Sequence, residues 1–300
     1  MSADVNLDNG LFDFHTHSNM SDGDCKPSNV VALAKMRNIK YLALTDHDKV
    51  TGIEEALVSA NENSIKLASG CEFSTPHHKH IVGLCIDTKN QQLTKLLDYQ
   101  ASVVRDKITH IGKELAKLGF YNALDDVIAR SIKGSTINNY CFARYLEDIG
   151  ACAKNTGYEK FFATGGLVPK FHSKWSSIEE VCEVILASGG IPILAHLWRY
   201  YLPKNCKEYE DLNVRKKTME ELVERFKAAG GIGLEIDGSR VEEWNYEFLY
   251  GLAKKYDLYV SAGSDFHNED SPTSKNFGRK FLLPEDLIPI WHHERFKFLN

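Results

Sequence analysis

The sequence predicts an α/β protein in which a closed barrel of mostly parallel strands is interrupted by a mostly helical insertion. Short apolar runs alternate with helical patterns over the first 97 residues, and the same alternation resumes near residue 176. Repeated strand–helix units of this length imply a mostly parallel sheet, and six or seven of them favour a closed barrel. Residues 98–175 contain helical patterns but no convincing strand. We therefore expect a barrel from residues 1–97 and 176–300, with residues 98–175 as a helical insertion that caps the active site.

The expected elements follow in order along the chain. In the first half, strands lie at residues 10–14, 41–45, 66–72 and 80–85, with helices at 27–37 and 53–61. Pro27 stands at the start of its helix, where the missing N–H costs least. A long helix at 101–118 dominates the insertion. In the second half, helices at 178–188, 218–229 and 242–255 alternate with strands at 191–195, 232–236 and 258–262, and glycine pairs end the first two of these helices.

Composition excludes several classes of protein. Hydrophobic residues make up 43% of the chain and charged residues 26%, which is ordinary for a globular protein and argues against disorder. The net charge of −5 gives no basic field of the kind that nucleic-acid coating proteins carry. The seven cysteines are odd in number and scattered without a CxxC pair, which favours a reducing compartment. Neither a signal peptide nor an apolar run of the roughly 20 residues that cross a membrane is evident, so we expect a cytoplasmic protein.

Histidines and carboxylates gather at the ends of the expected strands. Alternate residues of a strand share a face, so His15 and His17 can point at one ion. In a parallel barrel the carboxyl ends of all strands meet at one face, which is where active sites form. His80 stands at a strand start and therefore requires a reversed strand or a returning loop. The whole set is His15, His17, Asp22, His47, Glu72, His80, His196, Asp265 and His267.

Each of these residues has an ordinary structural explanation when it is taken alone. His47 lies between two aspartates that suit a helix-capping turn, and Glu72 or His196 could be a hydrogen-bonded core group. The convergence of nine such groups favours a metal site instead. Imidazole nitrogen with carboxylate oxygen suits Zn, Mn or Fe(II) better than Ca or Mg. Nine candidate ligands exceed the needs of one ion, so we expect two or three divalent ions.

Five short runs resemble the PHP (polymerase and histidinol phosphatase) superfamily: DFHTH at 13–17, DG at 22–23, LTDHD at 44–48, GCEFS at 70–74 and GSDFH at 263–267. The resemblance covers nearly the whole chain. It is strongest to the branch that contains ribonuclease AM and the 3′,5′-nucleotide bisphosphate phosphatases. Five further segments carry that resemblance: HIVGL at 80–84, FARYL at 142–146, VPKFH at 168–172, LAH at 194–196 followed by RY, and FGR at 277–279.

The resemblance implies a distorted (β/α)7 TIM-like barrel with a trinuclear metal site. One ion would be held by His15, His17, Glu72 and Asp265. Glu72 would bridge to a second ion, which His80 and His196 complete. A third ion would be held by Asp22, His47 and His267. All nine positions carry the expected residue types, which argues against a metal-free relative.

The expected chemistry is hydrolysis of a phosphate ester, with a metal-bridging hydroxide as the nucleophile. Arg144 and Arg199 are the candidates for binding phosphate oxygens, because the guanidinium matches them bidentately; a surface salt bridge is the alternative for each. Asp22 or His267 is the candidate that protonates the leaving group, although a metal ligand seldom has a spare proton site.

Other residues leave alternatives open. Phe171, His172 and Trp175 could stack on a base, although burial in the insertion's own core is the more common role of such residues. His77 and His78 are expected in a solvated loop, although a shift in register could let one replace His80 as a ligand.

The chain also departs from the branch's pattern. Where the branch has Ile-Thr-Arg-x-His, this chain has INNYC at 137–141, so Asn139 and Cys141 replace an arginine and a histidine. After the fifth strand the branch has His-Pro-Gly-Arg-Tyr and this chain has HLWRY at 196–200. The substrate is therefore less constrained by the motifs than the chemistry is.

The sequence thus favours an enzyme that acts on 3′,5′-nucleotide bisphosphates, on 5′-phosphorylated RNA in the 5′–3′ direction, or on both. The expected partner is a nucleotide or a short RNA, with no membrane and no obligate protein partner evident. A small-molecule phosphatase of histidinol-phosphatase type is one alternative. A non-catalytic accessory module is another, although the complete set of ligands and the absence of a fused polymerase oppose it.

Overall fold

The computed structural model describes residues 7, 10–132, 134–200, 212–238, 243–270, 274–281 and 283–300. By its internal contacts the chain divides into two compact units, Met1–Leu97 with Ser176–Asn300, and Asp98–Trp175. Below, the first is called the barrel unit and the second the helical unit. In the described residues, no helix is long and apolar enough to cross a membrane.

Seven strands form the sheet of the barrel unit, and they lie in sequence order. All neighbours are parallel except the pairs β3–β4 and β4–β5, which are antiparallel. Backbone hydrogen bonds also join the first strand to the last, from Phe14 N to Ala262 O (3.3 Å) and from Asp265 N to His15 O (2.8 Å). These bonds close the sheet, and the fold class predicted from the sequence is confirmed. The strands are β1 Leu11–Asp13, β2 Ile39–Leu44, β3 Lys66–Thr75, β4 Lys79–Leu84, β5 Ile191–Leu194, β6 Gly233–Asp237 and β7 Tyr259–Ala262.

The reversed direction of β4 explains the unusual place of His80. A single short turn, η1 (Pro76–His78), joins β3 to β4 as a hairpin in which Glu72 pairs with Val82 and Ser74 with His80. The start of β4 therefore lies at the same end of the barrel as the end of β3. The strand predicted at 66–72 is three residues shorter than β3. The pairing with β4 in the hairpin continues past the apolar residues to Thr75.

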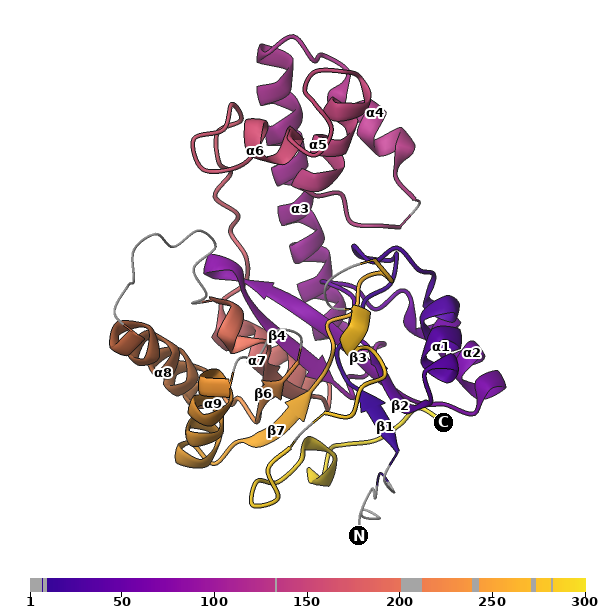
Figure 1. Ribbon diagram of the computed structural model, residues 1–300, viewed down its shortest axis with the longest axis vertical. Coiled ribbons are helices and arrows are strands. Elements are labelled where there is room, and N and C mark those ends of the chain that lie inside the picture. The colour runs from indigo at the N-terminus through magenta and orange to yellow at the C-terminus, as the bar shows by residue number, and fades with distance from the viewer. Residues whose placement is uncertain are drawn as a thin grey trace. The chain divides into compact units, whose positions relative to one another are not determined.

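Helices cover the outside of the barrel unit (Figure 1), with α1 (Pro27–Met36) and α2 (Ile53–Asn63) beside β2 and β3, and α8 (Leu212–Ala228) and α9 (Glu243–Lys255) near β6 and β7. Helix α7 (Ile178–Ala187) begins at a capping box, in which Ser177 and Glu180 bond each other's backbone N–H. The short turns η2 (Leu197–Tyr200), η3 (Ser274–Asn276) and η4 (Ile290–His292) complete the unit. Helix α8 begins no later than Leu212, whereas the predicted start is residue 218. The start was predicted too late because residues 212–217 are mostly polar and show little helical periodicity.

Side chains of the strands alternate between two apolar layers. Leu42 and Leu44 of β2 pack in the cluster that includes residues of α1 and α2. Ala43, between them, packs in a different cluster with Phe14 and Ala68. This period of two is what a strand buried on both faces requires. It also fixes which residues at the strand ends turn toward the barrel axis.

The helical unit has its own core, formed by residues such as Leu115, Phe142, Leu146 and Phe161. Its elements are α4 (Ala123–Arg130), α5 (Asn139–Asp148), α6 (Gly157–Phe161) and most of α3 (Gln91–Lys117). Helix α3 begins ten residues before the predicted start at 101. The sequence signal for this start is Asn90, whose side chain accepts hydrogen bonds from the backbone N–H of Gln92 (2.8 Å) and Leu93 (3.1 Å).

Candidate metal centre

All nine predicted ligands converge in the barrel unit, at the end where β1, β2, β3, β5 and β7 finish. Three groups of side chains each have their ligand atoms within 4.8 Å of one another. Most of the cluster is buried, while Asp22, His47, His80 and His267 are partly exposed. The groups are His15, His17, Glu72 and Asp265; then His47, Glu72 and His80; then His17, Asp22, His47 and His267.

The geometry shares ligands more widely than the three predicted sets. His17 lies in the group with Asp22 as well as in the group with Glu72, and His47 also appears in two groups. His196 falls outside these groups, yet its Nε2 is 2.7 Å from Glu72 Oε1. The nine side chains are therefore placed together, and the division of ligands among individual ions remains a proposal.

The end of β1 directs two imidazoles into the cluster because the strand geometry continues beyond Asp13. Thr16, between them, points the other way, where its hydroxyl donates to Ala43 O (2.7 Å) and its N–H to Thr45 Oγ1 (3.1 Å). Alternation therefore turns His15 and His17 to the opposite side, with ring centroids 5.2 Å apart. The HxH spacing works here because a threonine anchors the residue between the histidines.

Two residues of the cluster adopt the left-handed backbone region. Asp265 has φ 54° and His196 has φ 26°, a conformation that is uncommon for residues with a side chain and is often found at functional sites. Gly263 makes the turn before Asp265 possible, since a Cβ there would lie 2.3 Å from the Cβ of His15. The backbone is thus arranged to bring the GSDFH segment against β1.

Glu72 stands at the centre and is fully buried. Its Oε2 lies 3.2 Å from His15 Nε2, from His17 Nε2 and from His47 Nδ1. Its Oε1 lies 2.9 Å from His80 Nδ1 and 2.7 Å from His196 Nε2. Burial alone would raise the pKa of this carboxyl, but attraction to His47, His15 and His80 holds it well below its usual range. Five imidazoles therefore surround one ionised carboxylate.

The donor atoms fit a metal better than a hydrogen-bonded network. Three buried atoms have no hydrogen-bond partner among the described residues: His15 Nε2, His47 Nδ1 and Glu72 Oε2. Each of the two nitrogens nevertheless lies 3.2 Å from Glu72 Oε2. Lone pairs that meet without hydrogen-bond geometry suit a shared cation. Burial lowers the pKa of His196 to about 4, whereas the neighbouring carboxylates, against the effect of burial, raise the pKa of His15 and of His17. The cluster of His, Asp and Glu thus fits a metal site.

Asp22 and His267 form a pair at the partly exposed side of the cluster. His267 Nε2 lies 3.4 Å from Asp22 Oδ1, and its Nδ1 lies 2.9 Å from the carbonyl oxygen of Asp265. Burial and the nearby His17 would lower the pKa of His267, but Asp265 and Asp22 raise it overall. Burial would raise the pKa of Asp22, but His47 and His267 lower it. The two side chains therefore favour each other's charged forms.

The RY dipeptide after β5 contacts two of the candidate ligands. The Arg199 guanidinium forms an ion pair with Asp265, and 29% of its side chain is exposed. The hydroxyl of Tyr200 accepts a hydrogen bond from the backbone N–H of His80 (2.7 Å). Arg199 therefore lies beside the cluster of candidate ligands, with part of its surface open to solvent.

Arg144 lies on α5 of the helical unit, where its side chain is exposed. His77 and His78 are exposed at the tip of the β3–β4 hairpin with φ of 61° and 56°, and among the described residues it is His80 that joins the cluster.

Asn139 and Cys141, two residues that depart from the branch's pattern, lie in the helical unit as well. The side chain of Asn138 caps α5 by accepting from the N–H of Tyr140 (2.9 Å) and Cys141 (3.3 Å). Asn139 follows at the first position of this helix, and its Oδ1 has no partner among the described residues.

The three residues considered for base stacking lie at the end of the helical unit. The ring of Phe171 packs 5.3 Å from that of His110, Trp175 is half-buried and His172 is exposed.

Sequence analysis missed three buried carboxylates that hold the ligands in place. Asp46 accepts from Ser18 N, Ser18 Oγ and Ser21 Oγ, each at 2.7 Å, and so fixes the loop before Asp22. Asp13 accepts from Ser264 N (2.9 Å), and burial raises its pKa to about 7. Glu235 contacts His15 and His196. A sequence signal existed for two of them, because Asp13 and Glu235 interrupt otherwise apolar strands.

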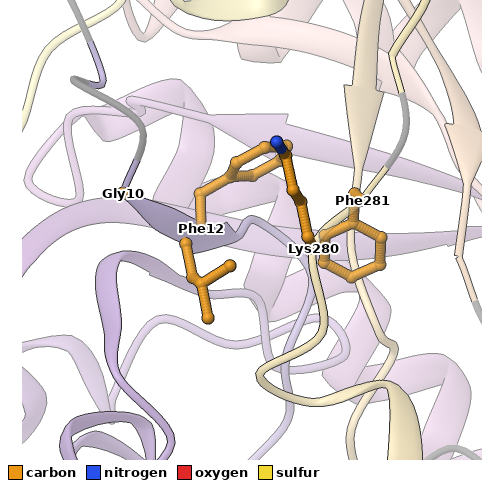
Figure 2. Close-up of a pocket in the computed structure, with 5 residues that line it drawn as sticks. Gly10, Phe12, Lys280 and Phe281 are labelled. Atoms are coloured by element: carbon orange, nitrogen blue, oxygen red, sulfur yellow. The ribbon is translucent and has the colours of Figure 1, made fainter.

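A small hollow lies elsewhere on the barrel unit, at the start of β1 (Figure 2). Its lining is mostly apolar and aromatic, with one lysine: Gly10, Leu11, Phe12, Lys280 and Phe281. Among the residues that the structure describes, no carboxylate or imidazole lines it. Since the metal cluster follows the other end of β1, this hollow is separate from the candidate site.

Comparison with known proteins agrees with the geometry. Residues 13–237 match the PHP domain. The chain is 33% identical to a 5′-3′ exoribonuclease of Haemophilus influenzae over 93% of this chain and 97% of that protein. It is 30% identical to a 3′,5′-nucleoside bisphosphate phosphatase of Chromobacterium violaceum, over 96% of this chain and 98% of the relative.

Solved structures give the same result. A Chromobacterium violaceum protein described as an amidohydrolase, with bound sulfate, superposes with a TM-score of 0.77 at 30% identity, covering 93% of this chain and 94% of that one. A Bifidobacterium adolescentis protein at 22% identity has a TM-score of 0.68 and shares the fold. The resemblance inferred from the motifs is confirmed. The prediction that the protein is a metal-dependent enzyme that hydrolyses phosphoric esters is also confirmed. The chain belongs to the PHP family.

Proposed function

We propose that this protein is a metal-dependent phosphoesterase acting on nucleotides, either as a 3′,5′-nucleotide bisphosphate phosphatase, as a 5′–3′ exonuclease on 5′-phosphorylated RNA, or as both. The observation that carries the proposal is the convergence of six histidines and two aspartates around the buried Glu72. Support for the substrate class comes from the relatives, which are named for these two activities and are similar over more than nine tenths of the chain.

Three divalent ions would share the cluster. His15, His17, Glu72 and Asp265 would hold the first, Glu72 with His80 and His196 the second, and Asp22 with His47 and His267 the third. Imidazole and carboxylate donors suit Mn, Zn or Fe(II). When bound, such ions lower the pKa of a coordinated water and neutralise charge on the phosphoryl oxygens, which supplies the hydroxide nucleophile that hydrolysis needs.

Arg199 would bind and orient the phosphate. Its guanidinium is held beside the cluster by Asp265 and is partly exposed, so donors on the open side can reach a phosphate oxygen. Bidentate pairing of arginine with phosphate gives both charge compensation and a fixed orientation. The ion pair with Asp265 keeps this donor in place before the substrate arrives.

The Asp22–His267 pair would serve the leaving group. With its Nδ1 donating to the Asp265 carbonyl, His267 presents Nε2 toward Asp22. A proton on that nitrogen can pass to the leaving oxygen. This role and ligation of a third ion exclude each other at the same atom, so the number of bound ions decides which one operates.

The helical unit would supply further substrate contacts and cap the active site. It contains 11 Lys and Arg against 8 Asp and Glu, a net charge of +3, whereas the rest of the chain has 25 against 33, a net charge of −8. A locally basic unit in an acidic protein favours a phosphate-bearing ligand. Exposed Arg144 on α5 is the candidate contact.

We also propose a cytoplasmic location. The six cysteines in the described part of the chain are free, which suits a reducing compartment. They are Cys25, Cys71, Cys85, Cys141, Cys152 and Cys182.

The test is release of phosphate and nucleotide from 3′,5′-adenosine bisphosphate and from a short 5′-phosphorylated RNA in the presence of Mn²⁺. Turnover that is abolished by chelator and by Asp265→Ala supports the proposal, and the ratio of the two rates separates phosphatase from exonuclease. Histidinol phosphate serves as the competing substrate. Preferred hydrolysis of histidinol phosphate, or metal binding without turnover of either nucleotide, would overturn the substrate assignment.

A further inference from the structure

We infer that Glu235 is a positioning residue that orients two candidate ligands facing different oxygens of Glu72, so that one carboxylate oxygen organises the adjacent metal positions. This inference rests on the metal site proposed above. Glu235 lies on β6 and is 2% exposed. Its Oε2 is 3.1 Å from His15 Nδ1 and 2.9 Å from the backbone nitrogen of His196. Three strands of the barrel therefore meet at this oxygen.

The contact with His15 fixes which nitrogen can bind an ion. A carboxylate only accepts hydrogen bonds, so His15 Nδ1 must carry the proton that Glu235 receives. The lone pair then lies on Nε2, which is 3.2 Å from Glu72 Oε2 and 3.4 Å from Asp265 Oδ1. A carboxylate behind a ligating histidine sets the tautomer, the ring orientation and the basicity of the ligand.

The contact with His196 acts on the backbone instead. His196 has φ 26°, an unusual conformation for a residue with a side chain. The hydrogen bond from its N–H to Glu235 holds this conformation, which directs Nε2 to Glu72 Oε1 at 2.7 Å. The rings of His15 and His196 stack with centroids 5.4 Å apart and planes 23° apart. Both rings therefore depend on the same oxygen for their placement.

The two oriented histidines reach different oxygens of Glu72. His15 faces Oε2 and His196 faces Oε1. Glu72 is the shared ligand of two proposed ions, so disturbing Glu235 affects the ligands on both sides of that bridge. A buried carboxylate is costly unless its partners compensate, and the partners of Glu235 Oε2 in the described structure are these two ligand residues. This arrangement indicates a role in positioning the ligands.

The experiment measures Co²⁺ binding to the full chain by titration calorimetry and by the visible spectrum of the bound ion. Glu235→Gln preserves the shape of the side chain while removing its charge and obligatory acceptor character. Removing such a partner typically costs roughly 10- to 100-fold in metal affinity. We expect a loss of that size, at more than one ion, with a changed Co²⁺ spectrum, while the far-UV circular dichroism of the metal-free protein stays as in the wild type.

Asp237→Asn is the matched control, because Asp237 lies two residues further along β6, is also buried, and pairs with Arg279. It should leave Co²⁺ affinity and spectrum unchanged. Should Glu235→Gln fail to fold, Glu235→Asp is measured instead; its shorter side chain withdraws the oxygen from both donors and should weaken binding as well.

Wild-type affinity and spectrum in a folded Glu235 variant would overturn the inference while leaving the proposed function intact. An equal loss in Asp237→Asn would also overturn it, since removal of any buried charge would then suffice. A wild-type protein that binds no Co²⁺, Mn²⁺ or Zn²⁺ would instead remove the metal site itself, and the inference with it.

Discussion

The barrel unit and the helical unit are built in contrasting ways. In the barrel unit, the functional side chains are mostly buried, and each is fixed by several neighbours, as Glu72 is by five imidazoles. The helical unit places apolar and basic groups on its surface. Nine of the fifteen large apolar side chains exposed in the described structure lie there, although the unit has 78 of the 300 residues. Two of them, Tyr140 and Tyr158, stack on each other with centroids 4.5 Å apart.

If the helical unit contacts the substrate as proposed, this difference separates the chemistry from the choice of substrate. Every proposed metal-ligand position in the barrel carries the residue type that the PHP resemblance implies. Two of the departures from the branch's pattern, Asn139 and Cys141, lie on α5 of the helical unit. A buried set of mutually dependent ligands tolerates little change, because each substitution removes a partner from several others. An exposed helix can change residues at little cost in stability, so specificity can vary there while the reaction is kept.

The largest effect should follow from removing ligands in the barrel. His15→Ala and Asp265→Ala should each lower kcat/KM by at least about 1,000-fold, since the ions contribute several kcal/mol of transition-state stabilisation. Bound metal, measured by elemental analysis after gel filtration, should fall as well. Arg225→Ala on the outside of α8, which pairs with exposed Glu179, is the control that should retain both. Full activity in either ligand variant would place the chemistry outside the barrel cluster.

A smaller but still severe effect should come from Gly263→Ala. The added Cβ would meet the Cβ of His15 at 2.3 Å and its backbone nitrogen at 2.6 Å, so β1 and the GSDFH segment must move apart. A shift of about 1 Å at a catalytic site can cost on the order of 100-fold in rate. Gly251→Ala, with nothing near its added Cβ, should keep wild-type kcat. Equal kinetics for the two variants would show that this close approach is not required.

Phe142→Ala tests whether the two units are also distinct in stability. Phe142 is fully buried in the core of the helical unit, and such truncations cost about 3–5 kcal/mol. Native-state hydrogen exchange should show faster exchange of amides in α5 and α6, with strand amides of the barrel unaffected. Faster exchange of barrel strands to the same degree would mean that the two units unfold as one.

The sequence made the barrel predictable and the helical unit less so, for identifiable reasons. Alternating strand and helix periods predicted all seven strands within a few residues, and the candidate ligands could be expected to lie together because strand ends converge. The start of α3 was missed, although Asn90 caps it and Leu93 and Leu96 are buried in its first turns. Glu235 is a charged residue within an apolar strand, but its role could not be predicted because it depends on contacts with residues 39 and 220 positions away. Long-range contacts of this kind have no local pattern.

Arg144 should have a modest effect that is confined to substrate binding. If it contacts a phosphate, Arg144→Ala should raise KM for 3′,5′-adenosine bisphosphate about 10-fold with little change in kcat, which is the size of one charged hydrogen bond. Arg130→Ala, on the neighbouring α4 and paired with Asp148, is the matched removal of a charge. A drop in kcat for Arg144→Ala, or the same rise in KM for both variants, would argue against a direct contact.

The smallest effect should come from restoring the branch's residues in the helical unit. Asn139→Arg combined with Cys141→His returns the arginine and histidine that the Ile-Thr-Arg-x-His pattern has at these positions. The capping residue Asn138 is left in place, so α5 should still begin at the same point. If these positions grip phosphate, kcat/KM on the bisphosphate should rise by about 3- to 10-fold, since a charge-assisted hydrogen bond contributes on the order of 1 kcal/mol or more. A rise on 5′-phosphorylated RNA alone would instead assign these positions to the polynucleotide, and a loss on both substrates would mean that this chain has adapted its helical unit to a different phosphate ester.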